Sequence, residues 1–318
     1  MTTPNVLQLR LWSVGYAAEG VMLFEFRSPE GLTLPPYTPG AHIDLYLPNG
    51  LVRQYSLVND YATGNRYVIA VKRSPASTGG SCYMHDQLRV GTLLQIGTPR
   101  NLFPLIENAE KSVFVAGGIG ISPIFSMIHR LAALGRSWEL YYALRRREDA
   151  ALFGDLPTSG TVHLHVSTER FGERLDVAAV VQNADPQAEL YCCGPNAMID
   201  DFVGATKACG RLPERVHVEY FSGAGPTEAS GSFSVELARS GRVIAVAAGV
   251  SIVEALREAG IETMVSCEKG VCGACETRVL RGTPDHRDLI LTEEERSEGQ
   301  LMMICCSRAK SEMLVLDL

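Results

Sequence analysis

Short strands dominate the first hundred residues of the chain. Apolar positions alternate with polar ones in residues 42–47, and residues 53–58, 67–73 and 92–97 are rich in apolar or β-branched side chains. Turn residues separate these segments at short spacing, and one short helix is expected around residues 82–88. The pattern predicts a small antiparallel β-barrel over residues 1–105.

At about Lys111 the pattern changes to strands that alternate with helices. The first strand, at 112–116, precedes a helix that has an apolar face formed by Ile124, Met127, Ile128 and Leu131. Further strands are expected at 138–144, 162–168, 189–194 and 216–221. This alternation predicts a parallel, doubly wound α/β domain over residues 106–221.

A third region follows a stretch rich in glycine, serine and proline at 222–232, which is expected to be a flexible linker. Beyond it, a hairpin turning at Ser240 and Gly241 precedes a helix that is capped by Ser251 and ended by Gly260. These elements predict an α+β domain over residues 233–318, so the chain is expected to be multidomain.

Composition and charge exclude only a few classes of function. The formal charge of −7 disfavours nucleic-acid binding, which usually requires a basic surface. The first twenty residues do not resemble a secretory signal, and no apolar run reaches the length of a membrane span. A cytoplasmic location is therefore expected, in which the nine cysteines are ligands or buried thiols rather than disulfides.

Three cysteines form a compact motif near the C-terminus. Cys267, Cys272 and Cys275 are separated by four and then two residues, which is the spacing of plant-type ferredoxins. Glycines inside this loop would let its N–H groups turn toward cluster sulfurs. A structural zinc site is the alternative, but zinc usually takes its cysteines in two short pairs. The motif therefore predicts a 2Fe–2S cluster, and the preceding hairpin and helix match a β-grasp fold.

The cluster needs a fourth cysteine, and two adjacent candidates follow. Cys305 and Cys306 lie in an apolar run, with 29 residues between Cys275 and Cys305. Neighbours in a strand point to opposite faces, so only one of the two is expected to be a ligand. Similarity to plant-type ferredoxins favours Cys305.

Two loops in the α/β region are candidates for nucleotide binding. Gly117, Gly118 and Gly120 follow a buried strand, and Ser122 and Pro123 are expected as the N-cap and first residue of the next helix. Amides at such a helix start suit a pyrophosphate, although the stretch alone could be a tight turn. A second loop, Cys193-Gly194-Pro195, ends a later strand of the same sheet. Buried core thiols are expected at Cys192, Cys82 and Cys209.

A third signal lies in the barrel, at Arg53-Gln54-Tyr55-Ser56. The forked guanidinium of Arg53 suits a phosphate, and Ser56 offers a hydroxyl next to a strand backbone that could bind a flat heterocycle. By itself this is a weak signal, because an exposed strand with a surface arginine is common.

Taken in this order, the three signals resemble the reductase components of Rieske-type oxygenases, the group of phthalate dioxygenase reductase and vanillate O-demethylase reductase. The resemblance covers nearly the entire chain. It implies a ferredoxin reductase-like flavin barrel, a nicotinamide-binding α/β domain and a C-terminal ferredoxin domain.

The resemblance also implies which barrel residues hold the flavin, expected to be FMN. Arg53, Gln54, Tyr55 and Ser56 would bind it, with Ser56 near the ring nitrogen that receives hydride. Ala70, Val71 and Lys72 would line another edge of the ring. The phosphate would lie at Thr78, Gly79, Gly80 and Ser81. Relatives commonly have arginine where this chain has Thr78, so FAD remains an alternative.

On the nucleotide side, the resemblance assigns the dinucleotide to Gly117, Gly118, Ile119, Gly120, Ser122 and Pro123. Cys193, Gly194 and Pro195 would lie beside the nicotinamide. Phe221 matches an aromatic near the flavin ring, although packing at a domain boundary would also explain it. Arg145 matches the position where relatives choose between NADH and NADPH, and NADH is favoured.

The implied function is electron transfer from NADH through FMN and the 2Fe–2S cluster to a separate Rieske-type oxygenase. Ser56, Cys193 and Phe221 would surround the hydride transfer, and no acid–base residue is needed. A cytochrome P450 as the acceptor is one alternative, and a non-catalytic electron carrier or zinc-stabilised binding module is another. The family suggests a monomer.

Overall fold

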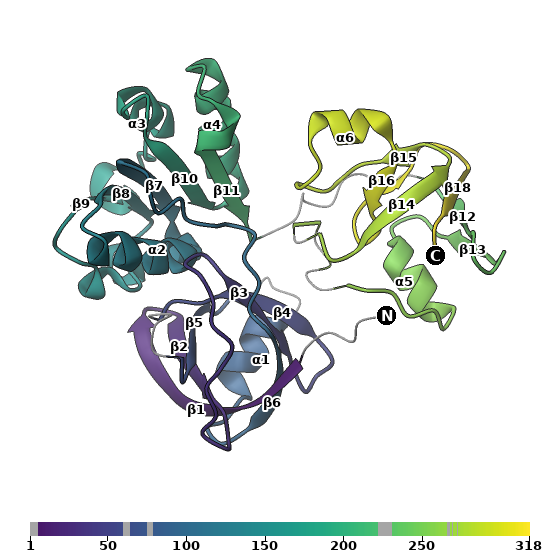
Figure 1. Ribbon diagram of the computed structural model, residues 1–318, viewed down its shortest axis with the longest axis horizontal. Helices are drawn as coiled ribbons and strands as arrows, with labels where there is room; N and C mark the ends of the chain where they lie inside the picture. The colour runs from purple at the N-terminus through teal and green to yellow at the C-terminus, as the bar shows by residue number, and fades with distance from the viewer. Residues whose placement is uncertain are drawn as a thin grey trace. The chain divides into compact units, whose positions relative to one another are not determined.

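The computed structural model describes residues 6–59, 64–74, 79–221, 231–265, 268, 270–271 and 273–318. The chain divides into two compact units, Met1–Phe221 and Ser222–Leu318 (Figure 1). The predicted linker at 222–232 lies outside the described residues except for its last two positions. Each unit has its own sheets and its own hydrophobic core.

The first six strands form one antiparallel sheet in the order β4-β3-β6-β1-β2-β5. Their bounds are β1 (Val6–Ala18), β2 (Val21–Arg27), β3 (His42–Tyr46), β4 (Val52–Ser56), β5 (Tyr67–Lys72) and β6 (Leu93–Gly97). The edge strands meet again where Leu57 pairs with Ile69 and the Val58 N–H donates to the Val68 carbonyl at 2.9 Å. The sheet therefore closes into a barrel, and the short helix α1 (Gly80–Asp86) follows β5.

The sequence pattern did not predict strands β1 and β2. Residues 12–16 of β1 are all exposed, including the large side chains of Trp12, Val14 and Tyr16. This stretch has no alternation between a buried and a solvated face, which is the signal that reveals a strand in a sequence. The position of β1 follows instead from its pairing with both β2 and β6.

The second sheet is parallel throughout, with the order β11-β10-β7-β8-β9. Its strands are β7 (Lys111–Gly117), β8 (Ser137–Leu144), β9 (Thr161–Val166), β10 (Glu189–Gly194) and β11 (Val216–Tyr220). Helix α2 (Ile121–Ala133) packs on the face that carries Phe114. Helices α3 (Val177–Asn183) and α4 (Asn196–Ala208) cover Val113 and Val115 on the opposite face. Alternate residues of β7 thus face different helices, as in a doubly wound sheet.

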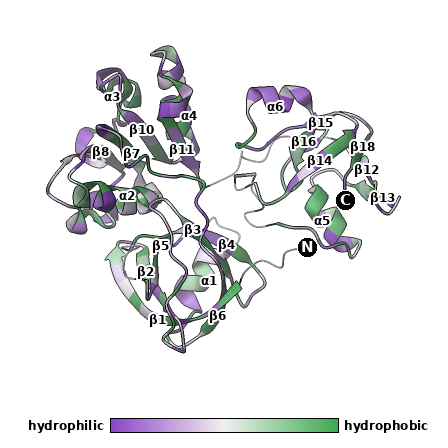
Figure 2. Cartoon of the chain, in the orientation of Figure 1, coloured by the Kyte–Doolittle hydropathy of each residue, from purple (hydrophilic) through white to green (hydrophobic). Residues whose placement is uncertain are grey.

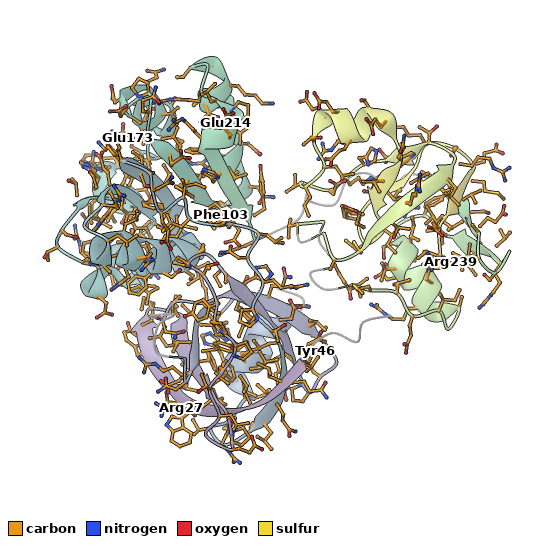
Figure 3. All side chains as sticks on the ribbon, in the orientation of Figure 1. Arg27, Tyr46, Phe103, Glu173, Glu214 and Arg239 are labelled. Atoms are coloured by element: carbon orange, nitrogen blue, oxygen red, sulfur yellow. The ribbon has the colours of Figure 1, made fainter. Side chains whose placement is uncertain are left out.

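The barrel and the parallel sheet share one hydrophobic cluster inside the first unit. Val21, Val58 and Ala70 of the barrel region belong to the same buried cluster as Phe114 and Ile124 of the α/β region. Phe103, which Figure 3 labels, lies in this shared cluster and packs edge-on against Tyr191 at 5.7 Å. The common core brings the predicted flavin strands close to the predicted nucleotide loops.

The second unit contains a mixed sheet with the order β13-β12-β18-β14-β16. Its strands are β12 (Phe233–Leu237), β13 (Val243–Val246), β14 (Glu276–Arg281), β16 (Leu301–Met303) and β18 (Met313–Leu316), and β15 (Pro284–Asp285) pairs separately with β17 (Arg308–Ala309). Helix α5 (Ile252–Glu258) buries Ile252, Val253 and Leu256 in the core. Helix α6 (Glu293–Glu298) has no buried residue and is hydrophilic along its length (Figure 2).

Two expected caps had different outcomes. The Ser251 hydroxyl accepts from the Glu254 N–H at 3.1 Å, which confirms it as the N-cap of α5. The predictions of Ser122 as the N-cap and of Pro123 as the first helical residue were wrong, because α2 begins at Ile121. The 3₁₀ turn η2 (Gly118–Gly120) leads directly into α2, so Ser122 lies inside the helical segment and its hydroxyl donates to the Ile119 carbonyl.

The predicted core thiols also differ from one another. Cys192 is buried in the sheet, as expected, and burial raises the pKa of its thiol. The prediction was wrong for the other two: Cys82 is only partly buried, and Cys209 is exposed because it lies at the C-cap of α4. No helix in the described part of the chain is long and apolar enough to cross a membrane.

Candidate functional site

The predicted flavin strand lies directly over the start of helix α1. A Cβ placed on Gly80 would lie 2.7 Å from both Cγ and Nε of Arg53, so the arginine stem covers this glycine. Gly79, the residue before α1, has a φ of 95°, which favours glycine. Arg53 and the helix start therefore form one basic, side-chain-poor surface, and such a surface fits a phosphate. Thr78 lies outside the described residues.

Residues of β4 alternate between the barrel interior and a polar face. Tyr55 packs on the barrel core, and burial raises its pKa to about 12 although Arg53 acts in the opposite direction. On the other face, Gln54 donates to the Asp44 carboxylate at 3.1 Å, and Arg100 pairs with the same carboxylate at 2.6 Å. Ser56, the last residue of β4, is 5% exposed. The strand thus presents Gln54 and Ser56 on one face and Tyr55 on the other.

Strand β5 brings the second predicted flavin segment against the nucleotide loop. Ala70 lies in the core shared by the two sheets, whereas the Val71 side chain points into the barrel core. Only the backbone of Val71 is therefore oriented toward a ligand on the Ala70 side. Strand β5 also contacts the η2 turn that follows β7. The structure therefore places the residues predicted for the flavin and for the dinucleotide next to each other.

The two predicted nucleotide loops are in contact because β7 and β10 are neighbouring parallel strands. A Cβ on Gly117 would lie 2.6 Å from Cδ of Pro195, and one on Gly120 would overlap the Cys193 carbonyl oxygen. Gly118 has a φ of 54° and faces open space, so its backbone is accessible. This crowded pair of loops with one open glycine fits a dinucleotide that approaches the backbone closely.

A carboxyl group that the sequence analysis missed lies beside Cys193. Glu219 on β11 pairs in register with Cys193 on β10, and its Oε2 is buried without a hydrogen-bond partner among the described residues. Burial raises the pKa of Glu219 to about 8. Burial, with a smaller contribution from Glu219, also raises the pKa of the Cys193 thiol. One acidic residue in an otherwise ordinary strand provided no sequence pattern that could have revealed it.

Three consecutive arginines at the end of β8 are not equivalent. Arg146 pairs with Asp149 at 2.9 Å, and Arg147 pairs with Glu169 through two nitrogens at 2.8 and 2.9 Å. Arg145 is exposed, and no carboxylate within the described ranges pairs with its guanidinium. Arg145 is thus the arginine of this group that is open to a ligand at the carboxyl edge of the sheet.

Phe221, the last residue of the first unit, packs against the core shared by the barrel and the α/β sheet. Packing at a domain boundary, one of the two explanations considered for Phe221, is therefore observed, and its position near a flavin ring stays a prediction.

In the second unit, the described part of the cysteine motif is consistent with a buried cluster. Cys275 and Cys305 are 4% and 7% exposed, and the backbones of their segments are joined where the Ile304 N–H faces the Cys275 carbonyl. The thiol of Cys306 is 3.7 Å from the Met303 carbonyl and lies against Gly270, where an added Cβ would overlap it. Gly270 and Gly273 both have a φ of 72°, as the loop prediction required. Cys267 and Cys272 lie outside the described residues.

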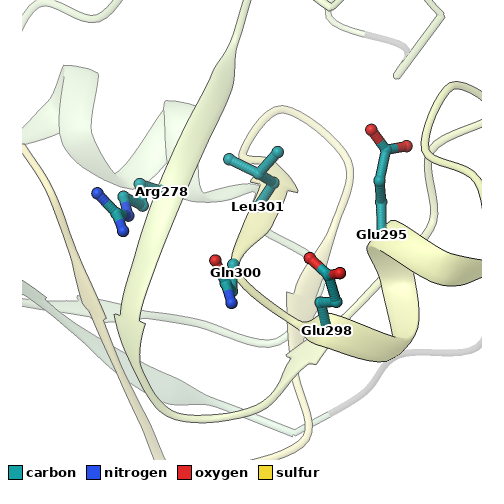
Figure 4. Close-up of a pocket in the computed structure, with 5 residues that line it drawn as sticks. All are labelled: Arg278, Glu295, Glu298, Gln300 and Leu301. Atoms are coloured by element: carbon teal, nitrogen blue, oxygen red, sulfur yellow. The ribbon is translucent and has the colours of Figure 1, made fainter.

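The described residues of the second unit also form a surface pocket of about 330 Å³. Arg278 on β14 lies at one side of it and Glu295 and Glu298 on α6 at the other (Figure 4). None of the predicted site residues lines this pocket, and the exposed carboxylates give it the character of a solvated surface.

Comparisons with known proteins agree with this arrangement. The 2Fe-2S iron-sulfur cluster binding domain family matches residues 235–310, a span that contains all four predicted cluster cysteines. Phenoxybenzoate dioxygenase subunit beta of Ectopseudomonas oleovorans is 49% identical over 313 residues, covering 98% of this chain and 97% of that protein.

Solved structures extend the comparison to the fold. The structure of a phthalate dioxygenase reductase, described as modular for electron transfer from pyridine nucleotides to [2Fe-2S], is 39% identical with a TM-score of 0.79, and the match covers 100% of both chains. An intact type IV self-sufficient cytochrome P450 monooxygenase is 35% identical with a TM-score of 0.78, and the match covers 98% of this chain and 41% of that one. The predicted multidomain fold of flavin barrel, doubly wound α/β domain and ferredoxin is thereby confirmed. The chain belongs to the phthalate dioxygenase reductase family and is an oxidoreductase that transfers electrons from a pyridine nucleotide through a flavin to an iron–sulfur cluster.

Proposed function

We propose that this chain is the NADH-dependent reductase component of a two-component Rieske-type oxygenase or demethylase, with FMN in the barrel and a 2Fe–2S cluster held by Cys267, Cys272, Cys275 and Cys305. The observation that carries the proposal is the contact between strand β5 and the η2 turn. It supports a single site in which a flavin on the barrel and a nicotinamide on the α/β sheet are adjacent.

The residues of the chain would bind and orient these groups. Arg53 and the amides at Gly79 and Gly80 would hold the flavin phosphate, and Ser56 would lie at the ring. The Gly117–Gly120 loop would hold the dinucleotide, with Cys193 near the nicotinamide and Phe221 near the flavin ring. When bound, the flavin supplies the exchange of a two-electron hydride for single electrons, and the cluster supplies one-electron transfer. The shared apolar core below these residues keeps water away from that side of the site.

The division of labour between the units can be tested with two neighbouring cysteines. We expect Cys305→Ser to abolish electron transfer to a purified Rieske-type oxygenase. This transfer is measured as reduction of the Rieske centre of the oxygenase. The same variant keeps NADH-driven reduction of a small dye at the flavin. Cys306→Ser is the matched control and is expected to retain both activities, because the predicted ligand is Cys305 and serine keeps a side chain of similar size against Gly270.

A folded Cys305→Ser variant that lost dye reduction as well would contradict this assignment of roles. Iron and acid-labile sulfide contents distinguish the cluster from a zinc site, and a colourless purified protein would refute both the flavin and the cluster.

A cytochrome P450 acceptor, with FMN or FAD as the flavin, is the second candidate. The similarity of 98% of this chain to part of a self-sufficient P450 monooxygenase favours it. Extraction of the bound flavin and its chromatography against FMN and FAD standards identifies the cofactor. Parallel assays with a Rieske oxygenase and a P450 identify the acceptor.

A further inference from the structure

The turn at residues 288–291 lies directly against the loop that contains three of the four predicted cluster cysteines. Gly270, in the loop between Cys267 and Cys272, is buried with a φ of 72°. A Cβ at this glycine would lie 3.0 Å from Cα and 3.2 Å from Cβ of Asp288. The Leu289 N–H donates to the Gly270 carbonyl at 2.9 Å. The turn at 288–291 therefore supports the cysteine loop from behind.

The side chain of Asp288 holds this turn together. Asp288 is 1% exposed. Its carboxylate accepts hydrogen bonds from the Leu291 N–H at 2.8 Å and the Ile290 N–H at 3.2 Å. The Ser307 hydroxyl donates to its other oxygen at 3.4 Å. Since Ser307 follows Cys305 by two residues, Asp288 connects the loop with three predicted ligands to the segment with the fourth.

A buried carboxylate requires compensation, and Arg296 of α6 provides part of it. The Arg296 guanidinium donates to the Asp288 carbonyl at 2.6 Å and lies 3.6 Å from the carboxylate. The arginine is 35% exposed whereas the aspartate side chain is 0% exposed. The negative charge is therefore less screened by solvent than the positive charge that balances it.

The hydrogen bond at Gly270 also determines which way the next amide points. In a trans peptide the C=O and the following N–H point in opposite directions. Because the Gly270 carbonyl faces the Leu289 N–H, the N–H of Val271 faces away from the turn. Val271 directly precedes Cys272, so the turn sets the direction of the amide next to a predicted ligand. Hydrogen bonds to the sulfurs and nearby charge are two of the factors that set a cluster potential.

We propose that Asp288 is a positioning residue for the iron–sulfur cluster, which fixes the turn that orients the cysteine loop and places a buried negative charge behind it. This inference rests on the cluster assignment in the proposed function. The charge disfavours adding an electron to the cluster, so Asp288 keeps the cluster a strong reductant.

The test is a redox titration of the cluster, with mediator dyes and visible circular dichroism, in the full-length protein. Asp288→Asn keeps an acceptor oxygen for the turn and removes the charge. We expect its midpoint potential to rise by about 59 mV, equivalent to a roughly tenfold change in the one-electron equilibrium constant. Asp285→Asn is the matched control, because Asp285 is 28% exposed and pairs with Arg287 at 2.8 Å in the same segment. We expect less than a quarter of that shift in the control.

A second variant keeps the test decisive if Asp288→Asn loses its cluster. Arg296→Gln removes the compensating charge at a partly exposed position, and we expect the midpoint potential of the cluster in this variant to shift in the negative direction.

An Asp288→Asn protein that folds but fails to retain the cluster, beside a control that retains it, also supports a positioning role. An unchanged potential and dichroism spectrum in Asp288→Asn, or equal shifts in the two aspartate variants, would overturn the inference. Absence of cluster absorption in the unmodified protein would instead overturn the proposed function itself.

Discussion

The glycines of the nucleotide loop and of the cluster loop are required for different physical reasons. Gly120 has an ordinary φ of −60°, but a Cβ there would overlap the Cys193 carbonyl oxygen and lie 2.9 Å from the Gly194 nitrogen. Gly270 has a φ of 72°, and a Cβ there would overlap the thiol of Cys306. The first glycine is needed because two backbones meet, and the second because the chain turns in a left-handed conformation against a side chain.

This difference indicates how each loop tolerates change. Two strands of a parallel sheet cannot separate locally without breaking their hydrogen bonds, so no neighbouring substitution can make room at Gly120. The overlap at Gly270 is with a side-chain sulfur, and a second substitution can remove it. The nucleotide loop is therefore rigidly specified by the sheet, whereas the packing of the cluster loop can be altered by side chains.

The strongest test of this comparison is Gly120→Ala. We expect it to abolish NADH-driven dye reduction and to destabilise the first unit by about 3 kcal/mol, because the overlap is between backbone atoms. Both tryptophans of the chain, Trp12 and Trp138, belong to this unit, so urea unfolding followed by tryptophan fluorescence reports on it alone.

Gly204→Ala is the matched control in the same unit. Gly204 lies in the interior of α4, and a Cβ there would meet nothing within 4 Å. Replacing a helical glycine by alanine is expected to stabilise the unit by about 0.5–1 kcal/mol. If Gly120→Ala were as stable as this control, the two strands would not be held as closely as the structure indicates.

The corresponding change in the cluster loop is Gly270→Ala, with a smaller expected effect. The left-handed conformation and the overlap with Cys306 together should cost the second unit about 2–3 kcal/mol. Loss of the visible dichroism of the cluster in urea measures this unit, and tryptophan fluorescence should show the first unit unchanged. Adding Cys306→Ala should recover about half of the loss, since it removes the overlap with the thiol but neither the strain in φ nor the close approach to Asp288. No recovery would mean that the overlap with the thiol contributes no measurable part of the cost.

The same two loops show what could be predicted from the sequence. The spacing of Cys267, Cys272 and Cys275 and the glycines at 117–120 are short-range patterns, and both were read without a structure. The contact between Arg53 and Gly80 joins segments that are 27 residues apart, so it was available only as an implication of the family resemblance. Strand β1 was not predicted because its exposed stretch has no alternation between buried and exposed positions.

Buried carboxyl groups were harder to recognise than cysteines or glycines. Glu219 and Asp288 are single acidic residues in a chain that has many, and their sequence neighbours do not distinguish them. Only tertiary packing shows that both are enclosed, one beside Cys193 and the other behind Gly270. Burial of a charge-bearing group is a long-range property, which sequence patterns over a few residues do not record.

The carboxyl of Glu219 allows a test of the nucleotide side by pH. Its pKa is raised to about 8 in the folded protein, whereas an unfolded glutamate loses its proton near 4.5. The folded state therefore binds more protons between these values, so the stability contribution is complete below about pH 4.5 and is lost as pH rises to 8. Glu219→Gln should flatten the dependence by roughly 2 kcal/mol between pH 5.5 and 8, allowing for partial enclosure at ~1.4 kcal/mol per pKa unit. Urea unfolding by tryptophan fluorescence at both pH values measures it, and parallel curves for the two proteins would show that Glu219 titrates normally.

The smallest expected effect concerns nucleotide choice at the edge of the same sheet. Arg146 and Arg147 are paired with Asp149 and Glu169, which leaves Arg145 as the arginine of the three that is open to a ligand in the described structure. An arginine at this edge can accommodate the 2′-phosphate of NADPH, whereas NADH has no group there that needs it. Arg145→Ala should therefore lower kcat/KM for NADPH about tenfold, on the order of 1.4 kcal/mol, and change that for NADH less than twofold. The control Arg147→Ala should leave the NADH to NADPH ratio unchanged, because Arg147 is already bound to Glu169 through two nitrogens. An equal loss with both nucleotides in Arg145→Ala would mean that this residue binds a part common to them, and the choice between them would then depend on another residue.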